Sequence, residues 1–391
     1  MATEVDVTSA EWLDRARSLS PVIEKWRDEG ERQRRLPAPI FEAMGDAGLF
    51  RMWTPRRYGG YEVDSATRVQ VVEEVARQDG AAGWNLFIGG SGGLFAAYLP
   101  EAAAAEIFTQ PDSLVAGSFA PTGQAVPVPG GHRLTGRWSF ASGCNQANWM
   151  VAGAFVLEDG RPKIGPGGVP ERQLFFLPAK ECQILDTWYT AGLRGTGSQD
   201  FELTDVFVPE GREFPFDDLL RSPDGPADAT SASFMEIAIP VMAAVGLGIA
   251  RDAIDSFKEM TAKKTPRGGT STLLTYHTVH EKVGRAEAML GAARAYLYEA
   301  VRGVASRPAS REPVEESLAL VRLAGSYAAE ASAEVASLMF TAGGGSAVYA
   351  TSRLERCFRD ANMVTHHVLV QPMNFEMVGQ YHLGLGLQMR R

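Results

Sequence analysis

Long stretches of helical periodicity in the second half of the sequence constrain the fold of this chain most strongly. Apolar residues recur at helical spacing through four stretches, each well beyond the mean helix length of globular proteins. These stretches are Ser233–Lys264, Thr275–Ser306, Pro313–Thr341 and Ser346–Leu369. Because long amphipathic helices bury their apolar stripes against one another, we predict a C-terminal four-helix-bundle domain over residues 226–391.

The first 110 residues carry the signals of shorter helices. Ser9 can cap a helix that begins at Ala10, and Pro39 stands where the first turn of another helix is expected. Helical spacing of apolar residues resumes from Ser65. We therefore predict an N-terminal α-helical domain over residues 1–110.

Composition changes at Pro111, and the next segment has the pattern of β-structure. Short alternating runs separated by turn residues follow, among them HRLTGRWSFAS and QDFELTDVFVP. Such runs predict an antiparallel β barrel or sandwich over residues 111–225. Residues 214–232 are rich in Pro, Asp and Ser and are expected to link this domain to the bundle. The expected fold class is thus α+β, in three domains.

Charge and composition argue against several classes of function. A formal net charge of -9 does not suit a nucleic-acid-binding surface, which needs clustered Lys and Arg. The N-terminus has no signal-peptide pattern, and we expect no apolar run of membrane-spanning length. Cys144, Cys182 and Cys357 have neither metal-ligand spacing nor an even count, so we expect no metal site and a cytoplasmic protein.

The last long stretch contains two adjacent histidines, His366 and His367, which we expect in its final helical turns. The unperturbed pKa of imidazole is closest to neutrality among the side chains, so such a pair in a pocket can act as base, acid or hydrogen-bond donor. The alternative is that one histidine packs in the core and the other faces water. The sequence motifs around the two histidines help to decide between a catalytic and a structural interpretation.

Four stretches, in this order, resemble signatures of the acyl-CoA dehydrogenase superfold. They are LFRMWTPRRYGGYEVD, GHRLTGRWSFASGCNQANWMVAGAF, TWYTAGLRGTGSQDFELTDVFVPE and FTAGGGSAVYATSRLERCFRDANMVTHH. The resemblance covers nearly the whole chain and implies a flavoprotein, usually a homotetramer. It also implies that the flavin lies between the β domain and the C-terminal bundle.

The residues after Arg359 separate the two classes that use this fold. Dehydrogenases of the family need a glutamate base, but Arg359 and Asp360 are followed by ANMVTHHV, which has no carboxylate. Asp255 and Glu259 lie near an alternative position for this base and are out of register. The stretch instead is similar to that of the two-component flavin-dependent (group D type) monooxygenases, which carry a histidine eight residues after a comparable arginine. His367 holds that position.

This second resemblance implies the chemistry of the site. Reduced flavin reacts with O2 to give a C4a-hydroperoxide, which must be kept dry and hydrogen-bonded. Ser142 and Gly143, in FASG, resemble the family's pair beside the flavin, and Ser142 would donate to flavin N5 or to the peroxide; a turn-capping serine is the alternative. His367 would deprotonate the substrate or hold the peroxide proton. His366 could replace it, because helical neighbours point about 100° apart.

Further flavin contacts follow from the resemblance. Ser118, in GSFAPTG, matches the position that bonds the pyrimidine edge of the ring. Trp188 lies where the family places an aromatic side chain near the isoalloxazine, although it could equally be a buried structural residue.

Other residues are candidates for contacts with the phosphate end of the cofactor. Arg267, or failing it Lys264, follows the first bundle helix, where a neighbouring subunit often supplies a phosphate contact. Gly343 and Gly344 would let the backbone approach the flavin tail. A solvated surface arginine and an ordinary helix-to-helix turn are the respective alternatives.

The apolar N-terminal segment GWNLFIGGSGGLF departs from the family pattern. Several hydroxylases of this class have a histidine in this segment, facing the substrate. Here Asn85 and Ser91 are the only polar side chains, which suggests a larger or more apolar pocket. We expect Trp84 and Asn85 to contact the substrate.

The sequence as a whole therefore predicts a flavin-dependent oxidoreductase. It would be the oxygenase component of a monooxygenase that takes reduced, diffusible FMN (or FAD) from a separate flavin reductase. With O2 it would hydroxylate an aromatic or heteroaromatic small molecule. Two alternatives remain open: an acyl-CoA dehydrogenase with FAD and its base elsewhere, and a non-catalytic flavin-fold subunit.

Overall fold

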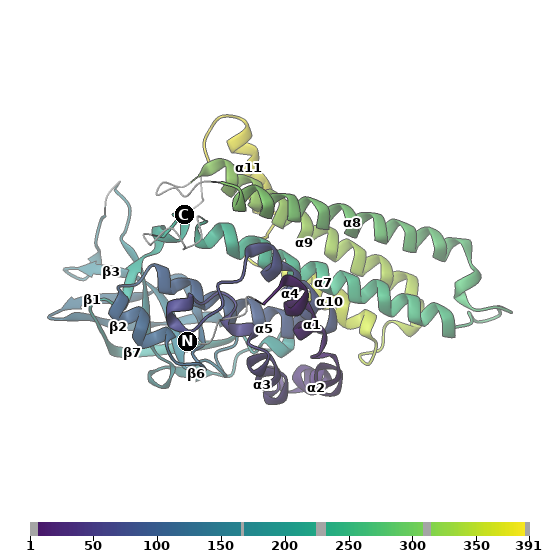
Figure 1. The fold of residues 1–391 in the computed structure, drawn as a ribbon, viewed down its shortest axis with the longest axis horizontal. Helices are drawn as coiled ribbons and strands as arrows, with labels where there is room; N and C mark the ends of the chain where they lie inside the picture. Colours follow the sequence, from purple (N-terminus) through teal and green to yellow (C-terminus); the bar gives the residue numbers. More distant parts are fainter. Residues whose placement is uncertain (1–6, 166–167, 224–231, 308–313, 388–391) are drawn as a thin grey trace.

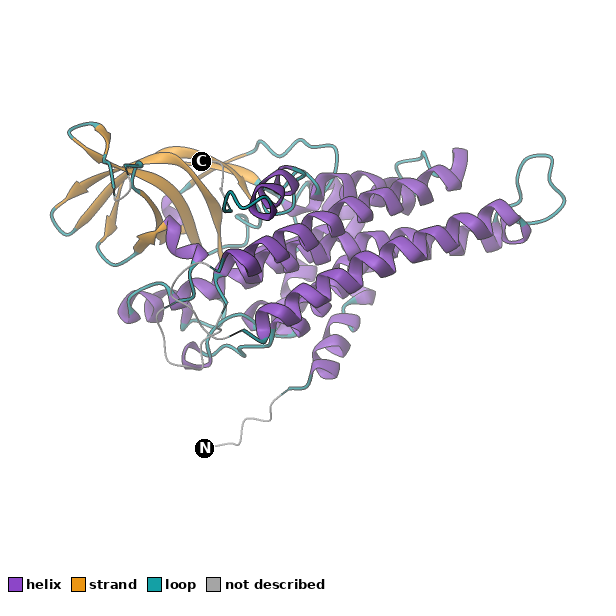
Figure 2. Cartoon of the chain, turned by 90° about the horizontal axis from the view of Figure 1, so that it is seen from above, coloured by secondary structure: helices purple, strands orange, loops and turns teal. Residues whose placement is uncertain are grey.

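A β-sheet lies at one end of the protein and a set of long helices extends away from it, with the N-terminal helices beside the junction (Figures 1 and 2). The computed structural model describes residues 7–165, 168–223, 232–307 and 314–387. This arrangement agrees with the expected acyl-CoA dehydrogenase-like fold.

Six α-helices form the N-terminal part of the chain. They are α1 (Ser9–Arg17), α2 (Ser20–Gln33), α3 (Ala38–Asp46), α4 (Ser65–Gln78), α5 (Gly80–Ser91) and α6 (Glu101–Phe108). The first cap differs from the expectation, because Thr8 rather than Ser9 accepts the hydrogen bond from the backbone N–H of Glu11. Glu11 in turn accepts from the backbone N–H of Thr8 and so completes a capping box.

The middle segment forms one mixed sheet. Its strands are β1 (Val115–Val128), β2 (Gly131–Ala141), β3 (Trp149–Glu158), β4 (Arg161–Pro162), β5 (Arg172–Pro178), β6 (Gln183–Leu185), β7 (Gln199–Pro209) and β8 (Glu213–Pro215). Their order is β6-β7-β2-β1-β3-β5-β8, with β4 paired to β3.

The expectation of a purely antiparallel sheet was wrong at one pair, because β1 and β3 run parallel. The hairpin partner of β1 is β2, and the chain then crosses back to place β3 on the other edge of β1. Part of the expected linker is also ordered. Strand β8 and a short 3-10 helix at Phe216–Leu220 occupy its start, and residues 224–231 lie outside the described residues.

The C-terminal part contains α7 (Phe234–Lys263), α8 (His277–Ala305), α9 (Glu315–Gly343), α10 (Arg353–Val364) and α11 (Met373–His382). The first three match the expected long helices within a few residues. Helix α7 begins with a capping box in which Ser233 and Glu236 bond each other's backbone N–H.

The fourth expected helix is shorter than predicted at both ends. It begins only at Arg353 and ends at Val364, where the Thr365 hydroxyl donates to the Asn362 carbonyl and the chain turns. Apolar spacing continues into this turn, which is why the sequence pattern suggested a longer helix. His366 and His367 consequently lie after the helix and not within it.

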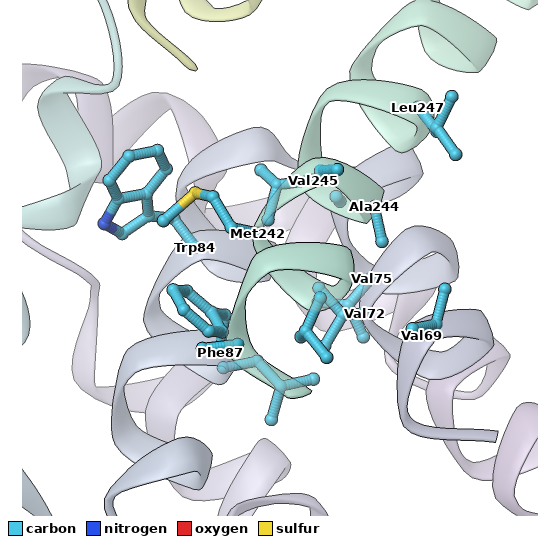
Figure 3. Packing of buried hydrophobic residues seen from close by; sticks show 14 of the residues in the cluster. Val69, Val72, Val75, Trp84, Phe87, Met242, Ala244, Val245 and Leu247 are labelled. Atoms are coloured by element: carbon cyan, nitrogen blue, oxygen red, sulfur yellow. The ribbon is translucent and has the colours of Figure 1, made fainter. Parts of the chain in front are cut away.

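Helix α7 is the central element of the core. By length and composition it could cross a membrane, contrary to the expectation that no apolar run is long enough, but 94% of its apolar window is buried inside the protein. Figure 3 shows how it is covered: Trp84 and Phe87 of α5 face Met242 and Val245 of α7. Trp84 therefore reaches the candidate site from a closely packed wall.

Candidate active site

The turn after β2 carries Ser142 into the protein interior. Phe140 has a φ of +67° and Gly143 a φ of +74°, so the chain reverses within a few residues. Ser142 is buried, and a Cβ on Gly143 would lie 3.1 Å from the side-chain Oδ1 of Asn85. The backbone N–H of Gly143 donates to the Thr196 carbonyl at 3.2 Å. This turn is therefore fixed against the loop that contains Thr196.

A chain of short hydrogen bonds runs through Ser142. The Trp84 indole N–H donates to the Ser142 hydroxyl at 3.0 Å, and the hydroxyls of Ser142 and Ser198 lie 2.6 Å apart. The Ser198 and Thr196 hydroxyls are 2.7 Å apart, and Thr196 donates to the Leu193 carbonyl at 2.8 Å. We call Trp84, Ser142, Ser198 and Thr196 the hydroxyl relay.

The direction of each bond in the hydroxyl relay follows from counting protons. A hydroxyl has one proton to donate, and that of Thr196 goes to a carbonyl, which can only accept. Thr196 must then accept from Ser198, and Ser198 must accept from Ser142. Ser142 also accepts from Trp84, so its unused capacity is an acceptor lone pair. The expected role of Ser142 as a donor is therefore revised: in this arrangement it accepts.

His367 lies beside the other end of the relay. Its ring packs edge-on against the Trp84 indole, with centroids 5.4 Å apart and an interplanar angle of 81°. Its Nδ1 accepts from the backbone N–H of Leu369 at 3.3 Å, which leaves the proton of the neutral ring on Nε2. Burial lowers the pKa of His367 to about 4. At neutral pH the ring is an N–H donor and a weak base, which favours the proton-holding role over substrate deprotonation.

His366 differs from its neighbour in environment. His366 is exposed to solvent. His367 is partly covered, and protein atoms surround its ring. The turn after α10 produces this difference, because it rotates the two side chains apart. The geometry thus brings His367, and not His366, against Trp84, whose indole N–H donates to Ser142.

A narrow cleft opens beside Ser142. Its lining is apolar with a few neutral polar groups: Phe41, Phe50, Asn85, Ile88, Gly89, Leu114, Ala116, Ser142, Gly143 and Gln146. Asn85 is buried and donates from Nδ2 to the Ala81 carbonyl at 2.9 Å and toward the Gly195 carbonyl at 3.4 Å. Among these described lining residues none is ionisable, so the cleft has no fixed charge of its own.

The two other expected ring contacts, Trp188 and Ser118, are not among the lining residues of this cleft. Trp188 is mostly buried, donates from Nε1 to the Leu193 carbonyl at 3.1 Å and packs 6.1 Å from the ring of Phe140. Ser118 is partly exposed on β1, opposite Ala152 of β3. Trp188 therefore anchors the loop that supports the hydroxyl relay, and its indole N–H is already used.

The expected phosphate contacts are not brought to this cleft within one chain. Arg267 is exposed in the turn after α7, and Lys264 donates to the Gly343 carbonyl at 2.6 Å beside Gly344. Phe234, at the start of α7, lies near the sheet, with its ring 5.6 Å from that of Phe119. A helix of 30 residues is about 45 Å long, so these groups lie at the far end of the bundle (Figure 1).

The carboxylates that a dehydrogenase would need are engaged elsewhere. Asp255 forms an ion pair with Arg77 at 2.9 Å on the outside of α7, and Glu259 is exposed. Asp360 is buried, and its Oδ1 accepts from the backbone N–H of Leu193 at 2.6 Å. Burial raises the pKa of Asp360 to about 7. It does not line the Ser142 cleft and acts on it only through the loop.

Sequence reasoning missed two residues of the site, Thr196 and Ser198. The Ser198 hydroxyl meets Ser142 across more than fifty residues of chain, and Thr196 is linked through Ser198, so no local pattern connects them. The available signal was the GTGS sequence itself: Gly197 has a φ of +57° and turns the two hydroxyls to the same side.

This chain is similar to known protein families and to characterised enzymes. The family described as "Acyl-CoA dehydrogenase, N-terminal domain" matches residues 15–107, and "Acyl-CoA dehydrogenase, C-terminal domain" matches residues 240–372. The indole-3-acetate monooxygenase of Pseudomonas putida is 32% identical over 360 residues, which are 91% of this chain and 89% of that protein. This chain belongs to the flavin-dependent monooxygenases of the acyl-CoA dehydrogenase superfold.

Two further relatives agree with this family. The oxygenase component of the FADH(2)-dependent resorcinol hydroxylase of Rhizobium sp. (strain MTP-10005) is 30% identical over 376 residues, covering 91% of this chain and 90% of that protein. XiaF from Streptomyces sp., solved in complex with FADH2 and glycerol, superposes with a TM-score of 0.89 at 27% identity. The match covers 98% of this chain and 97% of XiaF.

The residues at the cleft fit the ring of a reduced flavin. Ser142 offers a spare acceptor lone pair, which suits the N5–H group that only the reduced ring carries. Two aromatic side chains of the neighbouring turns, Phe140 and Tyr189, are each 70% exposed, as expected for surfaces that a flat ligand covers. Ser142, Ser118 and the neutral imidazole of His367 are the groups that would hold it.

Proposed function

We propose that this protein is the oxygenase component of a two-component flavin-dependent monooxygenase that hydroxylates an aromatic or heteroaromatic small molecule. It would take reduced FMN or FAD from a separate reductase. When bound, the reduced flavin supplies the two electrons with which one atom of O2 is inserted into a substrate C–H bond while the other leaves as water. The names of the relatives, an indole-3-acetate monooxygenase and a resorcinol hydroxylase, support this substrate class.

One observation carries the proposal: the Trp84 indole connects the neutral ring of His367 to Ser142, which lines a cleft whose described lining residues are not ionisable. A dehydrogenase needs a carboxylate at the reacting carbon, and Asp255, Glu259 and Asp360 are engaged elsewhere or exposed. A cleft without fixed charge does not draw in water or protons, which suits an oxygen-insertion reaction.

The residues of the site have two roles, which are to hold the flavin and to control the position of protons. Ser142 accepts from the flavin's N5–H because its own proton is donated to Ser198. His367 presents Nε2–H, and since its pKa is about 4 it keeps this proton as a donor throughout the neutral range. Trp84 keeps the two groups apart by donating to Ser142 and packing against the imidazole.

A product-based experiment tests the function. The purified protein is mixed anaerobically with photoreduced FMN or FADH2 and one member of a panel of phenols and indoles. Isotopically labelled O2 is then admitted in the presence of catalase. We expect labelled oxygen in a hydroxylated product for at least one aromatic substrate. Release of hydrogen peroxide alone, for every compound and both flavins, would overturn the proposal.

We also propose a homotetramer in which the far end of one subunit's bundle completes the flavin site of another. Arg267, Lys264 and Gly344 are candidates for the phosphate end of the flavin, yet about 33 Å of helix separates Lys264 from Met242, which packs beside Trp84 in the same chain. Mass photometry should find a tetramer, and Arg267→Ala should weaken binding of FMN while the tetramer persists. A monomer with full flavin affinity would contradict this assembly.

The same function supports a cytoplasmic location. Reduced flavin and its reductase require a supply of cellular reductant, and all three cysteines are free thiols. Cell fractionation of the native host would test this assignment.

A further inference from the structure

A second cavity shares no lining residue with the Ser142 cleft. Its walls are mostly apolar and aromatic and include Trp53, Leu94, Tyr98, Phe234 and Ile237. The space between them is about 400 Å³, including the opening to solvent. Apolar walls with a few convergent polar groups are the usual form of a small-molecule site.

The cavity contains a buried arginine, Arg68, whose Nε and Nη1 have no hydrogen-bond partner among the residues that the structure describes. Arg68 belongs to α4 and is 1% exposed. The indole Nε1 of Trp53, in the same wall, also lacks a partner. Its ring centre lies 6.0 Å from the Arg68 guanidinium carbon. Arg68 Nε, Arg68 Nη1 and Trp53 Nε1 are therefore three buried donors on residues that line the same cavity.

The nearby acids do not satisfy these donors. Both carboxylate oxygens of Asp64 accept from Thr67, at 3.0 Å from its backbone N–H and 2.6 Å from its hydroxyl. Glu62, which lines the cavity, lies 3.8 Å from Arg56. The hydroxyl of Tyr98 is used as well, since it donates to the Arg221 carbonyl and accepts from the backbone N–H of Phe234.

The charge on Arg68 persists despite its burial. Loss of solvation lowers the pKa of Arg68 to about 10, and Asp64 and Glu62 oppose this shift. The guanidinium is therefore still protonated near neutrality. A buried cation without acceptors is costly, and native proteins rarely retain one.

Arg51, from the neighbouring turn, shows how the same fold treats an arginine that serves structure. It is also buried, and its guanidinium donates to the backbone carbonyls of Tyr58, Phe108 and Gln110. Arg51 therefore supplies hydrogen-bond donors to three backbone carbonyls. Arg68 has no such set, so its role lies with something that enters the cavity.

We propose that this cavity binds a small organic carboxylate with a flat apolar body, whose oxygens accept from Arg68 and from Trp53 Nε1. Orphan donors without orphan acceptors select an anion, and the aromatic walls select an apolar body over a hydrated inorganic ion. The site requires neither flavin nor O2, so it stands independently of the monooxygenase reaction.

Binding of benzoate to the flavin-free, full-length protein tests the proposal. Calorimetry should detect benzoate binding, and benzoate should raise the unfolding temperature, whereas the neutral isostere benzamide should do neither. Arg68→Met should weaken benzoate binding by roughly tenfold or more, because a hydrogen bond to a charged group is lost. Its unfolding temperature without ligand should not fall, since the variant removes an uncompensated buried charge.

A second variant and a matched control complete the test. Trp53→Phe keeps the ring and removes the N–H, and it should weaken benzoate binding less than Arg68→Met does. Arg322→Met removes another buried arginine, which donates to Asn374 at 3.1 Å, and should leave benzoate affinity unchanged. Full affinity in both cavity variants, equal binding of benzamide, no binding of benzoate, or tighter binding of inorganic phosphate would each overturn the proposal.

Discussion

The loop from Trp188 to Ser198 is held from its two sides by opposite chemistries. On the side of the cleft all its partners are neutral: Ser142 and Ser198 are 2.6 Å apart, and Trp84 donates to Ser142 at 3.0 Å. No ion pair is needed there, because every proton of the hydroxyl relay has an acceptor.

The other side of the loop rests on charged side chains. Asp360 accepts from the Leu193 N–H, and Arg359 donates to the Ala191 carbonyl at 2.6 Å while pairing with Glu31 at 2.8 Å. In the same layer the half-buried Arg353 donates to the Asp252 carboxylate. We call these residues the charged layer.

Leu193 is where the hydroxyl relay and the charged layer meet. Its backbone has a φ of +50°, its N–H goes to Asp360, and its carbonyl accepts from both Thr196 and Trp188. A non-glycine residue in this conformation persists only when its surroundings over-determine it. Charged side chains thus hold the loop on the side that faces away from the cleft. The side that would meet the ligand has no charged group among the described residues that line the cleft.

The largest expected effect comes from breaking the charged layer at Arg353. Arg353→Met would leave the mostly covered carboxylate of Asp252 without its cation; the loss of one partner of a fully buried pair costs about 3–5 kcal/mol, and we expect a value toward the lower end of this range. Urea unfolding would measure this as a fall in the free energy of unfolding.

Arg302→Met is the matched control, because Arg302 pairs with Glu299 on an exposed helix face. Its cost should stay below about 1 kcal/mol. Equal costs for Arg302→Met and Arg353→Met would contradict the view that the charged layer stabilises the fold.

On the neutral side, His367 is the residue whose loss should most affect the reaction. His367→Phe keeps the ring beside Trp84 but removes the Nε2–H donor, so the rate of product formation should fall by roughly a hundredfold. His366→Phe, at the exposed neighbouring position, should leave the rate unchanged. The site assignment fails if His366→Phe is the slower of the two variants, whatever their stabilities.

A smaller effect is expected from interrupting the hydroxyl relay at Ser198. Ser198→Ala leaves the Ser142 proton without its buried acceptor, which should cost about 1–2 kcal/mol of unfolding free energy. It also frees Ser142 to act as a donor, so the affinity for reduced FMN should fall relative to that for oxidised FMN. Ser91→Ala, which affects only a bond within its own helix, should change neither quantity. An unchanged affinity ratio in Ser198→Ala would refute the assigned bond directions.

Much of the fold could be predicted from the sequence because the signals were local. Apolar spacing predicted the start of α7 within one residue, and the structure shows a capping box of Ser233 and Glu236 at that point. The end of α10 could not be predicted in the same way. Apolar spacing continues past Val364, but the Thr365 hydroxyl bonds back to Asn362 and stops the helix.

The candidate site was predictable only where one segment carried it. His367 and Ser142 each stood in a stretch that resembles a family motif, so both could be named from the sequence. The hydroxyl relay depends on Ser142 meeting Ser198, and its polarity depends on where the proton of Thr196 goes. Such relations are set by tertiary packing and have no sequence period.

The smallest expected effects are in the pH dependence of stability, where the two sides of the loop should act with opposite sign. The pKa of His367 falls from 6.5 to about 4 on folding, so between these values only the unfolded chain binds this proton, and stability should decrease as pH falls. The pKa of Asp360 rises from 3.8 to about 7, so there the native state holds the extra proton, and stability should decrease as pH rises.

Two variants separate these contributions in urea unfolding measured across that range. His367→Gln should reduce the loss of stability toward acid, because glutamine has no proton to gain. Asp360→Asn keeps an acceptor for the Leu193 N–H and should reduce the loss toward neutrality. Parallel curves for His367→Gln and the wild type would mean that the imidazole is solvated in the native state, and the neutral character of the cleft side would then have to be abandoned.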